Sequence, residues 1–178
     1  MATVLALAGF MGSGKTSVGR RAADLLGWQF IDLDDRVVLL AGRDIPEIFA
    51  TEGEDGFRRR ECDALRDIMT EDTHVPGRIV ALGGGTLTTS EAIACLHEGA
   101  VVVYLEVDAD EAWPRVQGTA RPLARDRESF AALLAERRRT YEHAADHRIS
   151  VAGRTPAEIA EEVAAIARAS TADEAGRW

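Results

Sequence analysis

The chain alternates between short apolar runs and longer segments in which apolar positions recur at helical spacing. Five mostly uninterrupted apolar runs are typical of parallel strands covered on both faces. They are Val4–Ala8, Gln29–Ile31, Ile79–Leu82, Val101–Leu105 and Ile149–Val151. Helical spacing is strongest at Lys15–Leu26, Phe57–Met69, Phe130–Tyr141 and Pro156–Ala169. Because strand and helix alternate throughout, the pattern predicts the α/β class with a central parallel sheet.

The chain has 178 residues, a length that fits one domain with a substantial core. We assign residues 1–169 to that domain. The start of its last helix is well marked, since Thr155 suits the N-cap and Pro156 suits the first helical position. Residues 170–178 are small and polar, and we expect them to form a flexible tail.

One internal segment lacks the hydrophobic periodicity of its neighbours. Residues Gln117–Glu128 include Gly118, Pro122 and several charged side chains. A loop this long inside a compact domain is usually functional. We therefore expect a mobile lid at about residues 114–127.

Charge and cysteine content narrow the classes of function. The net charge of −9 argues against a nucleic-acid partner, because binding a phosphate backbone needs a basic surface. Cys62 and Cys95 form no CxxC pair, so we expect no disulfide or zinc framework and a reducing, cytoplasmic setting. The apolar N-terminal stretch is too short to span a bilayer. Without coiled-coil heptads, a monomer with no membrane partner is the expectation.

Residues 9–16 read GFMGSGKT and match the phosphate-binding pattern G-x-x-x-x-G-K-[ST] between a predicted strand and a predicted helix. In such a loop the glycines turn backbone N–H groups toward phosphate oxygens, and the helix N-terminus adds positive charge. Lys15 is the single lysine among 21 basic residues. It would contact the β- and γ-phosphates, while the Thr16 hydroxyl would bind Mg²⁺. The motif predicts a nucleoside triphosphate site, but it does not separate a kinase from a motor or a switch.

Two arginines lie on the apolar faces of predicted helices. Arg58 shares a stripe with Leu65, and Arg137 follows Leu133 by four residues. An inward-facing arginine needs an anion, because an unpaired buried charge is costly. Either Arg58 forms an internal ion pair, for instance with Glu61, or Arg58 and Arg137 converge on the carboxylate of a ligand. Guanidinium groups suit such a planar target.

The second predicted strand ends in acidic residues. Strand alternation would place Asp32 and Asp34 on one side, where they could serve the metal shell and bind a substrate hydroxyl. Asp35 suits the N-cap of the next helix better. The third strand ends in three glycines, residues 83–85, which supply no carboxylate. They would let a ligand lie directly against backbone, although an ordinary flexible turn would also explain them.

Taken together, these segments resemble the shikimate kinase family. The likeness runs from Gly9 to about Glu162, and its segments, in the family's order, are GFMGSGKT, FIDLDD, IPEIFATEGEDGFRRRE, ALGGGT, ARPL and ERRRTY. The resemblance implies a P-loop kinase fold with a lid, in which three α/β/α layers surround a five-stranded parallel sheet of order 2-3-1-4-5. It also implies that ATP phosphorylates the 3-hydroxyl of shikimate, giving shikimate 3-phosphate and ADP in aromatic amino acid biosynthesis.

The resemblance also implies roles for individual residues by position. Residues on the ATP phosphates or beside the adenine would be Gly12, Ser13, Gly14, Lys15, Thr16, Ser17, Arg121 and Arg154. Residues binding shikimate would be Asp34, Arg58, Gly83, Gly84, Gly85 and Arg137. Thr16 would bind Mg²⁺, with Asp32 in the outer shell of the metal. Lys15, Asp34 and the lid residue Arg121 would be catalytic.

Some positions depart from the family's pattern. Residues 121–124 read Arg-Pro-Leu-Ala where Arg-Pro-Leu-Leu is frequent, and residues 113–116 are atypical, so we do not assign Arg115 to the adenine. Residues 86–89 are Thr-Leu-Thr-Thr in place of a more apolar stretch, which could alter substrate preference. Two other functions stay open: a kinase for another hydroxylated carboxylic acid, such as aminoshikimate or gluconate, and a non-catalytic nucleotide-binding module.

Overall fold

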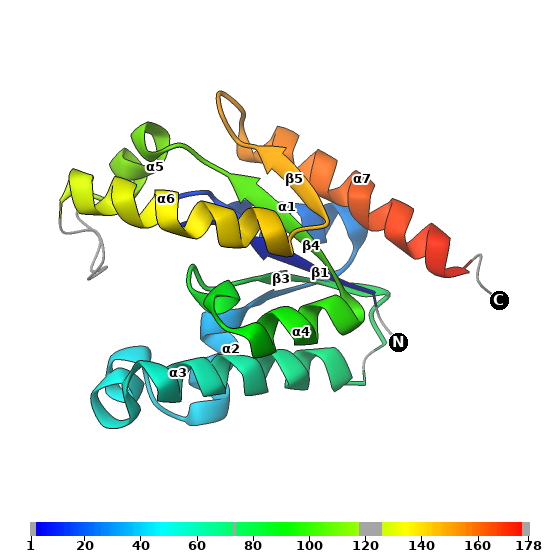
Figure 1. The fold of residues 1–178 in the computed structure, drawn as a ribbon. Helices are drawn as coiled ribbons and strands as arrows, with labels where there is room; N and C mark the ends of the chain where they lie inside the picture. The colour runs from blue at the N-terminus through cyan, green and yellow to red at the C-terminus, as the bar shows by residue number, and fades with distance from the viewer. Residues whose placement is uncertain (1–2, 73, 118–125, 176–178) are drawn as a thin grey trace.

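The computed structural model describes residues 3–72, 74–117 and 126–175. Its strands form one sheet with the order β2-β3-β1-β4-β5, and every neighbouring pair is parallel (Figure 1). The strands are β1 (Thr3–Ala8), β2 (Gln29–Asp32), β3 (Gly77–Ala81), β4 (Ala100–Glu106) and β5 (His147–Ser150). The predicted class, the parallel sheet and its strand order are confirmed.

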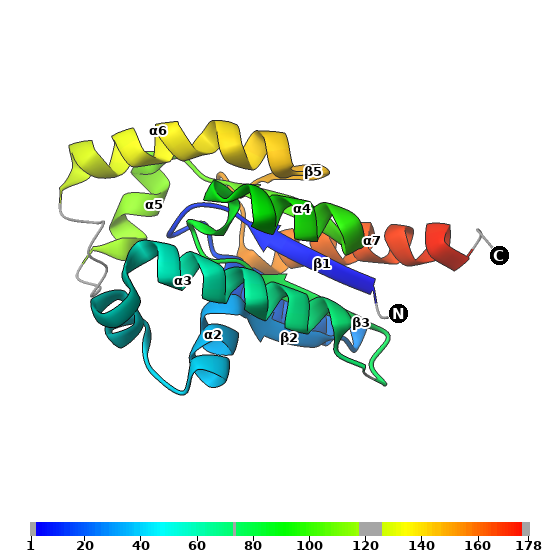
Figure 2. The ribbon, with the colours of Figure 1, turned by 60° about the horizontal axis from the view of Figure 1, so that its bottom comes forward.

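Helices cover both faces of this sheet. They are α1 (Lys15–Leu26), α2 (Leu33–Ala41), α3 (Ile45–Thr70), α4 (Ser90–Gly99), α5 (Ala109–Val116), α6 (Arg127–Ala144) and α7 (Pro156–Ala175), with a short 3-10 helix, η1 (Thr86–Thr88). Helices α1 and α7 pack against each other and against β1, whereas α4 packs against β1 and β4 with α3 beside it. Figure 1 shows α3 and α4 below β1 and α7 above it, which gives the expected three layers, and Figure 2 shows the molecule turned so that the side of α3 and α4 comes forward.

Burial explains which strands were easy to recognise. Every residue of β1 and β3 is buried, and the predicted apolar residues make up most of β1 and the end of β3. Strand β3 also includes the buried Arg78, whose guanidinium donates to the carbonyl oxygens of Ile68 and Glu71. The edge strand β5 is exposed except at Ile149, and it begins at His147 rather than at Ile149 as predicted. Its Arg148 donates two hydrogen bonds to Glu106 of β4, at 2.7 and 3.0 Å, so polar residues stabilise this edge. A search for apolar runs alone misses such residues.

Several helix boundaries differ from the predictions. Helix α3 begins at Ile45, before the predicted Phe57, and is interrupted at Gly53, whose φ of 69° lies in the left-handed region. Helix α7 continues to Ala175, so part of the segment expected to be a flexible tail is helical. The predicted lid range 114–127 overlaps the last turn of α5 and the first residue of α6. Its central part, residues 118–125, lies outside the described residues.

The topology brings three segments to one edge of the sheet. Because β1, β2 and β3 are parallel, the segments that follow them all leave from the carboxyl edge. These segments are the phosphate-binding loop, the acidic stretch that begins at Asp32, and the three glycines of residues 83–85. Within the described residues, no helix is both long and apolar enough to cross a membrane.

Candidate active site

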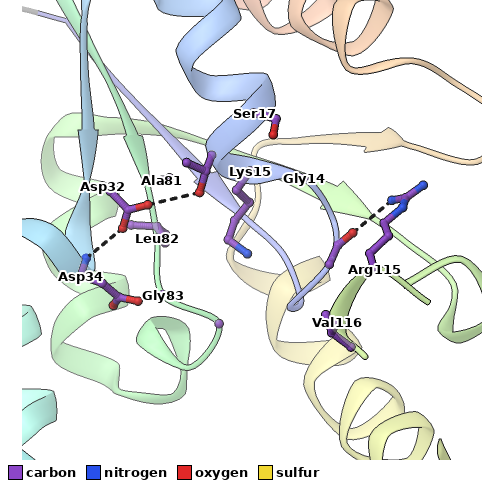
Figure 3. Close-up of a pocket in the computed structure, with 13 residues that line it drawn as sticks. Gly14, Lys15, Ser17, Asp32, Asp34, Ala81, Leu82, Gly83, Arg115 and Val116 are labelled. Atoms are coloured by element: carbon purple, nitrogen blue, oxygen red, sulfur yellow. Dashed lines mark hydrogen bonds between the residues drawn. The ribbon is translucent and has the colours of Figure 1, made fainter. Parts of the chain in front are cut away.

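A cavity of about 340 Å³ opens at this carboxyl edge, a volume within the range of small-molecule sites. Phosphate-loop residues, two aspartates, the first two of the three glycines and the end of α5 line it (Figure 3). The lining residues are Gly12, Gly14, Lys15, Thr16, Ser17, Asp32, Asp34, Ala81, Leu82, Gly83, Gly84, Arg115 and Val116. The cavity therefore joins the predicted phosphate site to the predicted metal site and part of the predicted substrate site.

The phosphate-binding loop needs glycine at two positions for distinct reasons. Gly9 has a φ of 148°, and a Cβ there would lie 2.7 Å from the Leu105 carbonyl oxygen of β4. Gly12 has a φ of 83°, and a Cβ there would lie 2.8 Å from the Ala112 carbonyl oxygen of α5. A side chain at either position would push the loop away from the elements that hold it. The loop is thus clamped between β4 and α5.

Lys15 and the start of α1 form the cationic part of the cavity. The Lys15 ammonium group donates hydrogen bonds to the carbonyl oxygens of Gly9 at 2.7 Å and Phe10 at 3.2 Å, so it lies across the loop. The N-cap of α1 is Gly14, which has no side chain to bind the first N–H groups of the helix. The buried Ser13 hydroxyl has no partner among the described residues. Such a concentration of donors and positive charge suits an anion.

Asp32 lies beside the phosphate loop. Its Oδ2 accepts a hydrogen bond from the Thr16 hydroxyl at 3.2 Å, and its Oδ1 accepts one from the Asp34 backbone N–H, also at 3.2 Å (Figure 3). Asp32 is therefore the N-cap of α2, and our assignment of that cap to Asp35 was wrong. The strand ends at Asp32, so Asp34 reaches the cavity from the first turn of α2 and not by strand alternation.

Arg58 is held by two carboxylates of very different exposure. Its Nη1 makes an ion pair with Glu61, whose side chain is 1% exposed, and its Nη2 lies 3.1 Å from Glu54, whose side chain is 67% exposed. The Thr86 hydroxyl donates to the other Glu61 oxygen at 2.6 Å. Burial alone would lower the pKa of Arg58, but Glu61 and Glu54 outweigh it and raise that pKa. The predicted ion pair with Glu61 is confirmed.

Arg137 reaches the glycine loop from α6. Its Nη1 donates to the Gly84 carbonyl oxygen at 2.8 Å, and the Tyr141 hydroxyl donates to the same oxygen at 2.6 Å. The guanidinium of Arg58 lies against the next residue, Gly85, where a Cβ would overlap it. The two arginines thus contact consecutive glycines, one from α3 and one from α6. Neither belongs to the lining of the cavity itself.

Comparison with known proteins decides the family. The family model described as shikimate kinase matches residues 11–168. The chain belongs to the shikimate kinase family. The shikimate kinase of Mycobacterium avium is 43% identical over 166 residues, which cover 89% of this chain and 90% of the relative. That of Streptomyces coelicolor is 39% identical over 161 residues, covering 89% and 91%.

Solved structures agree with membership of the shikimate kinase family. Shikimate kinase from Acinetobacter baumannii in complex with shikimate matches with a TM-score of 0.85 at 30% identity, covering 96% of this chain and 95% of that chain. A gluconokinase from Sinorhizobium meliloti matches with a TM-score of 0.62 at 17% identity, covering 99% and 97%. At that identity the second match shows the fold alone, so it adds no support for gluconate as the substrate.

In this shikimate kinase family member, the predicted site residues fall into three groups. The structure brings the phosphate loop, Asp32, Asp34 and the glycine loop together around the cavity, with Arg58 and Arg137 against the glycine loop. Arg154 lies apart from the lining and forms an ion pair with Glu162 at 2.7 Å. Arg121 lies outside the described residues.

Three residues with contacts in this site, Arg115, Thr86 and Tyr141, were assigned no site role from the sequence, and Glu61 was predicted only as the ion-pair partner of Arg58. Arg115 lines the cavity and donates to the Gly12 carbonyl oxygen at 3.0 Å. Glu61, Thr86 and Tyr141 are buried and contact Arg58 or the glycine loop. The spacing of three residues between Arg58 and Glu61 predicted their ion pair. Nothing local in the sequence pairs Thr86 with Glu61, or Tyr141 with Gly84, because these contacts join distant segments.

Proposed function

We propose that this chain transfers the γ-phosphoryl group of ATP to the 3-hydroxyl of shikimate, giving shikimate 3-phosphate and ADP. The observation that carries the proposal is the cavity in which the phosphate loop faces Asp34 and the first two glycines of residues 83–85. The two arginines lie against the same glycines. A triphosphate and a hydroxylated acid bound to these groups would meet within one enclosure. The family to which the chain belongs supports the same reaction.

The phosphate loop would hold the triphosphate of ATP. Residues 12–17 supply backbone N–H groups and the positive end of α1, and the Ser13 hydroxyl lies among them. The Lys15 ammonium, now on the carbonyl groups of Gly9 and Phe10, would shift to the β- and γ-phosphates and stabilise the charge of the transferred group.

Thr16 and Asp32 fit a Mg²⁺ ion. Their oxygen atoms lie 3.2 Å apart on the cavity wall, and hydroxyl and carboxylate oxygens are ligands that Mg²⁺ prefers. The described residues hold no group of three or more His, Cys, Asp or Glu side chains that could bind a metal. Substrate phosphates and water would complete the Mg²⁺ site, with Thr16 as ligand and Asp32 in the outer shell. The bound ion would neutralise charge on the phosphates.

Asp34 and the two arginines would orient shikimate. Asp34, at the cavity wall, would accept a hydrogen bond from the substrate's hydroxyl and direct it at the γ-phosphate, which is the main requirement of phosphoryl transfer. Arg58 and Arg137 would bind the carboxylate. Gly83, Gly84 and Gly85 would let the ring approach backbone, since even a Cβ at Gly83 would lie 3.1 Å from Asp34.

Two further arginines complete the proposal by family resemblance. Arg121, in the segment between α5 and α6, would reach the phosphates and act as a catalytic residue, and closure of that segment would exclude water. Arg154, at the turn before α7, would lie beside the adenine. We further propose that the protein acts as a monomer in the cytoplasm.

Release of ADP in a coupled assay, measured with and without shikimate, tests the proposed function. We expect shikimate to increase ADP release far above the rate with ATP alone. We also expect the kcat/KM for shikimate to be higher than the kcat/KM for aminoshikimate or gluconate. A higher kcat/KM for gluconate or aminoshikimate than for shikimate would show that the other acid is the substrate. Binding of ATP without any acid-dependent ADP release would identify a non-catalytic module instead.

The Arg58→Lys variant tests recognition of the carboxylate in the same assay. Lysine keeps the charge but loses the planar pair of donors. The KM for shikimate should therefore rise much more than the KM for ATP. Equal changes in the two KM values would show that Arg58 does not bind shikimate.

A further inference from the structure

Tyr141 lies one helical turn after Arg137 on α6 and points its hydroxyl at the glycine loop. Its side chain is buried, and its hydroxyl donates to the Gly84 carbonyl oxygen at 2.6 Å. Arg137 Nη1 donates to that same oxygen at 2.8 Å. A carbonyl oxygen has two lone pairs, so it accepts both bonds at once. Tyr141 and Arg137 are thereby joined through one backbone atom.

We propose that Tyr141 is a positioning residue, which fixes the Gly84 carbonyl group and, through it, the guanidinium of Arg137 for binding the substrate carboxylate. The inference rests on the proposed function. The tyrosine itself would not touch shikimate. It determines where the arginine and the backbone of the glycine loop lie before the substrate arrives.

Flexibility of the glycine loop explains why such a support is useful. Residues 83–85 are all glycine, which has the widest choice of backbone conformations, and arginine has many rotamers. A site that orders these groups only when substrate binds loses affinity to that ordering. Tyr141 is rigid and its ring packs on that of Tyr104, with centroids 5.2 Å apart. The hydroxyl therefore comes from a fixed point in the core.

The peptide geometry extends the effect along the glycine loop. The described backbone has no cis peptide bond, so the N–H of Gly85 points away from the carbonyl oxygen of Gly84. With that carbonyl oxygen bound to two donors on α6, the N–H of Gly85 is turned away from α6. Gly84 itself lines the cavity. One hydroxyl thus orients an arginine and a backbone donor together.

The Tyr141 hydroxyl keeps its proton near neutral pH. Burial raises the pKa of Tyr141 to about 12, although the nearby Arg137 and Arg58 charges partly oppose that rise. A neutral hydroxyl is a hydrogen-bond donor, whereas a tyrosinate could not donate to a carbonyl group. The bond to Gly84 should therefore persist at neutral and mildly alkaline pH.

The neighbouring Tyr104 supplies a matched control. Its ring stacks on that of Tyr141 and is fully buried, but its hydroxyl has no partner among the described residues. Replacement of either tyrosine by phenylalanine removes one oxygen from the same aromatic pair and keeps the ring. Only the change at Tyr141 removes a hydrogen bond to Gly84. The hydrogen bond from Arg137 to Gly84 remains and keeps the glycine loop attached to α6.

The test compares Tyr141→Phe and Tyr104→Phe with the unmodified protein, by KM for shikimate, KM for ATP, kcat and thermal unfolding. Tyr141→Phe should raise the KM for shikimate about three- to tenfold, the range for one lost hydrogen bond, with KM for ATP changed less than about twofold. Tyr104→Phe should change neither. If both variants give the same shikimate KM as the unmodified protein, the inference is overturned while the proposed function stands.

A double-mutant cycle with Arg137→Lys separates positioning from a merely structural role. If Tyr141 acts through Arg137, the two substitutions together should raise the KM for shikimate less than the product of their separate effects. Independent, multiplicative effects would overturn the inference. Failure of the proposed function has a different signature, since the unmodified protein would then show no shikimate-dependent ADP release.

A substrate analogue gives a readout that loss of stability cannot imitate. The methyl ester of shikimate lacks the carboxylate charge that Arg137 would bind. With shikimate, the unmodified protein should have a higher kcat/KM than Tyr141→Phe. With the methyl ester, the two proteins should have nearly the same kcat/KM. An equally large ratio of the two kcat/KM values for the acid and the ester would contradict a role through Arg137.

Discussion

Arg58 and Glu61 form an ion pair one turn apart on α3, with the Glu61 carboxylate buried beneath the glycine loop. A Cβ at Gly83 would lie 2.8 Å from Glu61 Oε1, which shows how closely the two segments pack. The second guanidinium contact, to the exposed Glu54, is open to water and therefore weak. We infer that Glu61 holds the guanidinium in place, while Glu54 yields to the carboxylate of the substrate.

Glu61→Gln should weaken shikimate binding while leaving ATP binding intact. The variant removes the countercharge that fixes Arg58, and charge-assisted hydrogen bonds are among the strongest in proteins. We expect the KM for shikimate to rise at least about tenfold. Asp63→Asn is the control, because its ion pair with Arg66 on the same helix is largely exposed. Similar KM values for the two variants would show that the buried pair does not position Arg58.

Thr86→Val should reduce stability, because it removes the donor to a buried carboxylate oxygen and keeps the side-chain shape. The bond from Thr86 to Glu61 is 2.6 Å long. Leaving a buried acceptor without a donor costs about 1–3 kcal/mol, to be measured as the free energy of unfolding in urea. Thr70→Val removes an exposed hydroxyl at the end of α3, and a change within about 0.5 kcal/mol is expected there. If both variants lose the same free energy of unfolding, the hydrogen bond from Thr86 to Glu61 makes no particular contribution to stability.

Asp32→Asn should separate metal binding from helix capping. Asparagine caps a helix about as well as aspartate, so the bond from the Asp34 N–H can survive. The loss of charge beside Thr16 should raise the Mg²⁺ concentration for half-maximal activity about tenfold or more. Asp44→Asn makes the same change at the N-cap of α3 and serves as the control. An unchanged Mg²⁺ requirement in Asp32→Asn would exclude Asp32 from the metal site.

The stability that Glu52 contributes to the folded protein should be lost in acid. Hydrogen bonds from Arg60 and Arg43 lower the pKa of Glu52 from 4.5 to about 2. The folded protein therefore binds fewer protons than the unfolded chain in this range. The contribution of Glu52 is complete above pH 4.5 and disappears as the pH falls through the range to about 2.

Urea unfolding of the unmodified protein and of Glu52→Gln at several pH values measures this contribution. The difference in unfolding free energy should stay constant from pH 6 to 8 and shrink steadily below about pH 4.5. The neutral range serves as the internal control. A difference that does not change on acidification would contradict the lowered pKa.

The sheet and the phosphate loop could be predicted because their signals are local. Buried strands such as β1 show as apolar runs, and the glycines and Lys15 of the loop stand at fixed spacing between a strand and a helix. Pro156 and Thr155 mark the start of α7 in the same local way, and the Thr155 hydroxyl does accept a hydrogen bond from the Glu158 N–H. Each of these features depends on a few neighbouring residues.

The remaining site contacts depend on packing between distant segments. Nothing near Tyr141 indicates that its hydroxyl meets Gly84, which lies 57 positions earlier. The position of Arg115 depends on α5 packing against the phosphate loop, where Arg115 donates to the Gly12 carbonyl oxygen, a contact between segments about a hundred residues apart. The cap of α2 was assigned to Asp35 because the end of β2 could not be located to within a residue or two. Local patterns cannot supply these positions.

The solitary lysine has a practical consequence for labelling chemistry. Apart from the N-terminal amine, an acylating reagent finds one amine in this chain, the Nζ of Lys15. That atom lies across the phosphate loop on the carbonyl groups of Gly9 and Phe10. A nucleotide in the loop should shield Lys15 but not the N-terminal amine, so a lower yield of doubly acylated protein in an intact-mass spectrum would report occupancy of the loop without any coupled enzyme.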